Sequence, residues 1–75
     1  MKLNEAVNNV ILKIQRDTSY AEVIDWMVSM GATYRTDRDP NVLRWKSVSA
    51  SCTYHSPKAL VQRWVQNATN RLSRS

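Results

Sequence analysis

Residues 56–72, SPKALVQRWVQNATNRL, decide the fold because they predict the longest helix of the chain and one side of its core. Ser56 is a favoured N-cap residue, and Pro57 takes the first helical position, where its missing N–H costs no hydrogen bond. The apolar residues that follow recur at three- and four-residue spacing and form one arc of the helix: Leu60, Val61, Trp64, Val65, Ala68 and Leu72. We therefore expect a C-terminal amphipathic helix over about 57–72.

Two stretches nearer the N-terminus share this helical periodicity. Residues 4–16 carry apolar side chains on one face, and Asn4 is the expected N-cap. Residues 19–30 repeat the pattern behind a capping box, in which Ser19 and Glu22 each satisfy a free backbone N–H. Because only a short link separates the two helices, they predict an N-terminal α-hairpin.

Beyond the second helix the pattern changes from helical to alternating. Gly31 is the only glycine of the chain and stands where a left-handed residue ends a helix. Residues 32–36 and 42–46 alternate apolar and polar side chains, and residues 37–41 between them are rich in turn formers. This combination predicts a small antiparallel β-hairpin.

Residues 47–54 alternate once more, but their apolar positions are shifted relative to those before them. The parity changes between Trp45 and Val48, which fits either a bulge in one long strand or a tight bend into a third strand. Lys46 and Ser47 are poor residues for a two-residue turn, so we expect the bulge. The predicted fold is α+β in the order ααββα: an α-hairpin, a β-hairpin with a long bulged second strand, and the amphipathic helix, in a single compact domain over residues 1–75.

Charge divides the chain into two unlike halves. Residues 1–40 hold five Lys and Arg and all six Asp and Glu, whereas residues 41–75 hold six Lys and Arg and no acid, so the net charges are −1 and +6. No apolar run reaches the roughly 18 residues of a membrane span, and nothing resembles a secretory signal. With one cysteine and therefore no internal disulfide, we expect a cytoplasmic protein that does not bind membranes.

The sequence offers little for catalysis. Cys52 and His55 are the only Cys and His, which is too few for a zinc site, and their spacing on a strand points them to opposite faces. A single glycine also rules out a glycine-rich phosphate loop. We therefore expect no enzyme activity, no metal and no cofactor.

A polar stripe on the last helix is the main functional signal. Arg63, Asn67, Asn70 and Arg74 follow one another along one side of that helix, and no acid lies among them. Arginine and asparagine can bond base edges and phosphates, so the stripe predicts contact with nucleic acid or an acidic protein. The other interpretation is an ordinary solvent-exposed helix face.

Further cations could extend this surface. Arg44 and Lys46 share one face of the predicted second strand, and Lys58 lies at the start of the last helix. Trp26 stands one position away from the apolar line of its helix, so it either covers the edge of the core or contacts a partner.

These features support two hypotheses. The first is a small basic nucleic-acid-binding protein, regulatory in role, that uses its acid-free C-terminal half; the sequence does not separate DNA from RNA. The alternative is a protein-interaction module, an inhibitor or adaptor that docks its basic face on an acidic surface of a larger protein. Either could form a homodimer through a strand edge or Trp26. The order of helix, strands and helix, with Ser56-Pro57-Lys58 opening a basic helix, resembles the double-stranded-RNA-binding domain in topology alone, because that family's further lysines and glycine-rich connections are missing.

Overall fold

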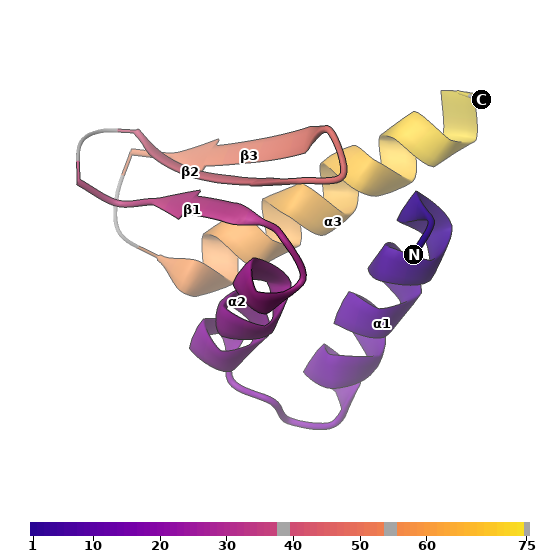
Figure 1. Cartoon of the computed structure of the whole chain (residues 1–75), viewed down its shortest axis with the longest axis horizontal. Coiled ribbons are helices and arrows are strands. Elements are labelled where there is room, and N and C mark those ends of the chain that lie inside the picture. The colour runs from indigo at the N-terminus through magenta and orange to yellow at the C-terminus, as the bar shows by residue number, and fades with distance from the viewer. Residues whose placement is uncertain (38–39, 54–55, 75) are drawn as a thin grey trace.

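A three-stranded antiparallel sheet forms one layer of the computed structural model, and three helices lie beneath it (Figure 1). The structure describes residues 1–37, 40–53 and 56–74. The elements are α1 (Leu3–Gln15), α2 (Tyr20–Ser29), β1 (Thr33–Arg35), β2 (Asn41–Trp45), β3 (Val48–Cys52) and α3 (Pro57–Arg74). The predicted α+β class is confirmed, and so is the order of two helices, antiparallel strands and a C-terminal helix.

The predicted N-caps of α2 and α3 are present. The Ser19 hydroxyl accepts a hydrogen bond from the backbone N–H of Glu22, and the Ser56 hydroxyl accepts one from that of Ala59, both at 3.2 Å. The expected cap of α1 was wrong, because that helix begins at Leu3 and Asn4 lies inside its first turn. The N-cap residue of α1 is instead Lys2, whose side chain makes no capping hydrogen bond.

Both N-terminal helices end on a residue in the left-handed conformation. Gly31 has φ 108°, and its N–H and that of Ala32 close the end of α2 onto two carbonyls of the last turn. Asp17 does the same for α1 with φ 61°. Glycine adopts this conformation freely, whereas an aspartate pays a steric cost for it.

The expected bulge between the second and third strands was wrong. Trp45 pairs directly with Val48, so Lys46 and Ser47 form a two-residue turn between two separate strands. Their φ angles of 55° and 63° are those of a type I′ turn, whose twist matches that of the flanking strands. Neither residue is Gly or Asn, and the turn forms because the buried faces of β2 and β3 require this register.

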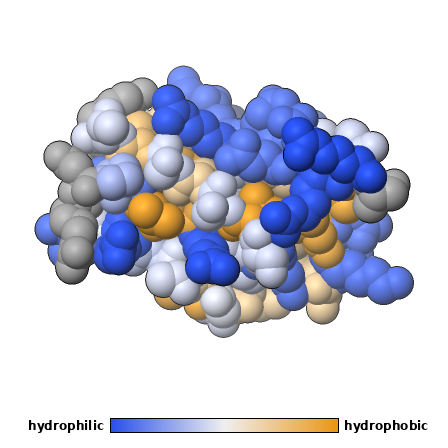
Figure 2. Space-filling model, turned by 90° about the horizontal axis from the view of Figure 1, so that it is seen from above, coloured by the Kyte–Doolittle hydropathy of each residue, from blue (hydrophilic) through white to orange (hydrophobic). Residues whose placement is uncertain are grey.

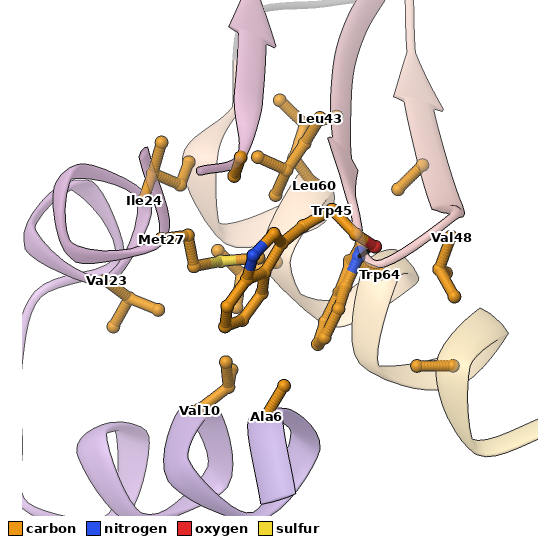
Figure 3. Close-up of a cluster of buried hydrophobic side chains, with 14 of the residues drawn as sticks. Ala6, Val10, Val23, Ile24, Met27, Leu43, Trp45, Val48, Leu60 and Trp64 are labelled. Atoms are coloured by element: carbon orange, nitrogen blue, oxygen red, sulfur yellow. Dashed lines mark hydrogen bonds between the residues drawn. The ribbon is translucent and has the colours of Figure 1, made fainter. Parts of the chain in front are cut away.

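Trp45 of β2 and Trp64 of α3 lie at the centre of the core (Figure 3), and Trp26 of α2 packs against its edge. Trp45 of β2 stacks on Trp64 of α3 with ring centroids 5.4 Å apart, and Trp26 of α2 meets Trp45 edge-on at 5.5 Å. The indole N–H of Trp64 donates to the Trp45 carbonyl at 3.2 Å, which satisfies its only polar group in the core. α3 thus packs against the sheet and against both other helices.

Candidate nucleic-acid interface

One side of the sheet faces the helices, and the other side is open. Strand side chains alternate between the two faces, so the register places two cross-strand rows on the outside. These rows, which we call the open face, are Thr33, Arg44 and Ser49 in one and Arg35, Val42 and Ser51 in the other. All are exposed except Val42, which is half-buried. Seen from above the sheet, hydrophilic groups cover most of this side and surround small hydrophobic patches (Figure 2).

The open face is hollowed between β1 and β2. Thr33, Arg35, Val42 and Arg44 line a shallow depression of about 260 Å³. The two arginines stand at diagonal corners of it, one on each strand. The Arg35 guanidinium is also 3.8 Å from the Asp37 carboxylate, but both side chains are more than half exposed, so water and salt screen this pair strongly.

Side chains of α3 cover the outer edge of β3. The Ser51, Ser49 and Ser47 carbonyls accept hydrogen bonds from Arg63 (2.7 Å), Asn67 (2.9 Å) and Arg71 (2.7 Å) respectively. A step of four helical residues rises about 6 Å, close to the roughly 6.7 Å between alternate residues of a strand, so the three bonds repeat in register. We call Arg63, Asn67 and Arg71 the edge ladder.

The edge ladder gives part of the predicted polar stripe a structural role. Arg63 and Asn67 hold α3 to β3 and satisfy carbonyls that an edge strand would otherwise leave free. Each guanidinium has five N–H donors, and the bond to its serine uses one nitrogen, so both arginines keep exposed donors for a ligand. Arg71, which the sequence analysis did not include, belongs to the ladder; its four-residue spacing from Asn67 was the available signal.

The other predicted residues of α3 lie apart from the ladder. The Asn70 side-chain oxygen accepts from Gln66 at 3.3 Å on the solvent side of the helix. Lys58 is exposed, but it precedes Arg63 by five residues and is therefore turned about 140° around the helix from it. Arg74 is exposed at the last position of α3, beyond the ladder rung at Arg71.

Cations gather where the β2–β3 turn meets the end of α3. Arg44 is paired opposite Ser49, and Arg71 reaches the carbonyl of Ser47, the next outward-facing residue. Lys46 precedes Ser47 in the turn, with its ammonium group 5.8 Å from the centre of the Trp45 ring. Arg44 and Arg71 thus come from β2 and α3 to the turn end of β3, whereas Lys46 belongs to the turn and lies against the inward Trp45 ring, so the expectation that it shares a strand face with Arg44 was wrong.

Acidic residues lie mainly on the opposite side of the protein. Glu5 and Asp17 are on or next to α1, and Glu22 and Asp25 are on α2. Among the described residues of the sheet and its connections, Asp37 is the only acid, and it lies two residues after the end of β1. The charge is therefore uneven in space as well, because Lys2, Lys13 and Arg16 nearly balance the four acids of the helical hairpin, whereas positive charge is in excess on the sheet and its edge.

Trp26 covers the edge of the core, the first of the two roles expected for it. It is half-buried, with Trp45 against one side and the Lys13 ammonium group 4.7 Å from its ring centre. Tyr34, on the inner face of β1, has a buried hydroxyl with no hydrogen-bond partner in the described part of the chain. Burial raises the pKa of this hydroxyl, and the nearby negative charge of Asp25 raises it further.

Cys52 is a free, buried thiol on the inner face of β3, and His55 lies outside the described residues. Within residues 1–37, 40–53 and 56–74, no three potential metal ligands come together. None of the helices described is long and apolar enough to cross a membrane. No family model matches this chain, and no curated protein or solved structure matches it, so its site is interpreted from its own chemistry.

Proposed function

We propose that this chain is a small, non-enzymatic nucleic-acid-binding protein that contacts its ligand through the open face and the edge of β3. One observation carries the proposal: arginines from β1, β2 and α3 converge on the side of the protein opposite its acidic helices. Such a surface attracts a polyanion, and the guanidinium groups offer paired donors to phosphate oxygens.

Each group has a definite part in the proposed contact. Arg44 binds a phosphate at the turn end of the sheet, and Lys46, held against Trp45, adds to the positive field there. Arg63 and Arg71 bind phosphates with the donors that their serine carbonyls leave free, and Arg74 extends this line past the end of β3. Lys58 is turned away and contributes only to the general positive field.

Fluorescence anisotropy at low salt tests the proposal with labelled single-stranded DNA, duplex DNA and duplex RNA. We expect binding to at least one probe, weakened several-fold in Arg44→Ala. Arg16→Ala is the matched control, because it removes the same charge from the far end of α1 and should bind as the wild type does. If no probe bound at tens of micromolar protein, the proposal would be wrong.

The same basic surface could instead dock on an acidic protein, and a pull-down from lysate separates the two ligands. We expect the material retained by the wild-type protein to disappear after nuclease treatment. A protein partner that resists nuclease and is lost from Arg44→Ala would contradict nucleic acid as the ligand.

A further inference from the structure

We infer that the nucleic acid is single-stranded and that one of its bases sits in the depression between Arg35 and Arg44. This inference rests on the proposed function and adds the class of ligand and the place of one base. It combines three features: the apolar floor of the depression, the repeat of the edge ladder and the low charge of the solvent side of α3.

The depression fits an unpaired base. Its floor is the half-buried Val42, and the flanking groups are two guanidiniums and the Thr33 hydroxyl. A base offers an apolar face to Val42 and stacks readily against planar guanidinium groups. The volume of about 260 Å³ lies below the range of pockets that enclose a whole drug-sized ligand, so it suits one ring system rather than a larger molecule.

The edge ladder fits the backbone of an extended strand. Arg63, Asn67 and Arg71 form a straight row of side-chain donors along the edge of β3. Donors recur along this row about every 6–7 Å, which is the length of one nucleotide in a stretched single strand. The phosphates of a duplex curve away from such a straight edge.

α3 is poorly suited to enter a duplex groove. Its solvent side carries the uncharged Gln62, Gln66, Thr69, Asn70 and Ser73, and among the described residues of α3 Lys58 in the first turn is the one cation beside them. A helix in the major groove is normally anchored by cations that contact the phosphates on both sides. In α3 the arginines lie instead on the flank that is bonded to β3.

Asp37 provides a sharp test of the depression. Its carboxylate, 3.8 Å from the Arg35 guanidinium, competes with the base for that group and repels the phosphates on either side of the base. Asp37→Asn should therefore bind a single strand two- to five-fold more tightly. Asp17→Asn is the matched control, since it removes the same charge from the end of α1 and should leave the affinity unchanged.

The experiment measures anisotropy at low salt. It compares a labelled single strand of about 15 nucleotides and mixed composition with a hairpin whose stem contains the same sequence. We expect at least about ten-fold tighter binding of the single strand, and the gain in Asp37→Asn alone. If the duplex bound as tightly or more tightly, the inference would be overturned while the proposed function stood. Equal affinities of the two Asp→Asn variants would overturn the proposed position of the base in the depression. No binding to either probe would overturn the proposed function itself.

Discussion

The edge ladder makes a quantitative prediction, because Asn67 and Gln66 are neighbouring, exposed amides with different partners. Asn67 donates at 2.9 Å to the Ser49 carbonyl, eighteen residues away in sequence. Gln66 donates at 3.3 Å to Asn70, one turn along the same helix. The first bond joins α3 to the sheet, whereas the second stays within α3.

Replacing each amide by alanine separates these roles. A hydrogen bond between distant elements contributes about 1 kcal/mol, and an exposed side-chain pair at four-residue spacing contributes about 0.3 kcal/mol. In a chain of 75 residues, about 1 kcal/mol corresponds to a fall in Tm of about 4–8 °C. Asn67→Ala should therefore show a fall of this size, and Gln66→Ala a fall of only about 1–2 °C.

Urea unfolding followed by circular dichroism measures the two free energies directly, and thermal unfolding gives the Tm values. Alanine is a better helix former than either amide, and the gain is larger at Asn67 than at Gln66, so helix propensity works against the predicted difference and the two falls in Tm are upper limits. If Asn67→Ala were no less stable than Gln66→Ala, the ladder would contribute nothing to the fold, and the polar stripe would again be available in full for a ligand.

Three other changes test the fold and its pH dependence. Lys46→Asn combined with Ser47→Gly should raise the free energy of unfolding by about 1 kcal/mol in urea, because both positions have positive φ; a loss would contradict the type I′ turn. Asp17→Gly should raise it by about 0.5–1 kcal/mol, whereas Asn8→Gly in the middle of α1 should lower it by about 0.3 kcal/mol. Tyr34 has a raised pKa in the folded state, so folding favours its neutral hydroxyl. Its contribution to the free energy of unfolding is complete below the unfolded pKa near 10 and is lost as the pH rises from there through the folded pKa. Tyr34→Phe should lessen this alkaline loss of stability in a pH series of urea unfolding, and identical profiles would refute a buried hydroxyl.

Local patterns predicted most of the fold. The caps at Ser19 and Ser56, the stop at Gly31 and the apolar arc containing Trp64 each depend on residues close in sequence, and all were confirmed. The turn at Lys46 and Ser47 was missed because its conformation is unfavourable locally. Pairing between β2 and β3 determines it, and such pairing cannot be inferred from two turn residues alone.

The candidate site was only partly predictable for the same reason. Periodicity placed Arg63 and Asn67 on one flank of the last helix, but it could not show that this flank lies against the edge of β3. Arg35 was not among the predicted site residues, but the register brings it to the same depression as Arg44. Cross-strand neighbours depend on register, which requires the fold.

The salt dependence of binding tests the central claim most directly. For a single strand, the logarithm of the association constant falls against the logarithm of salt concentration with a slope of about −0.7 for each phosphate contact. Three to four contacts from the turn end and the ladder predict a slope of about −2 to −3 for the wild-type protein, about 0.7 shallower in Arg44→Ala and unchanged in Arg16→Ala. Equal slopes in all three proteins would show that the open face does not meet the phosphates and would contradict the proposed function.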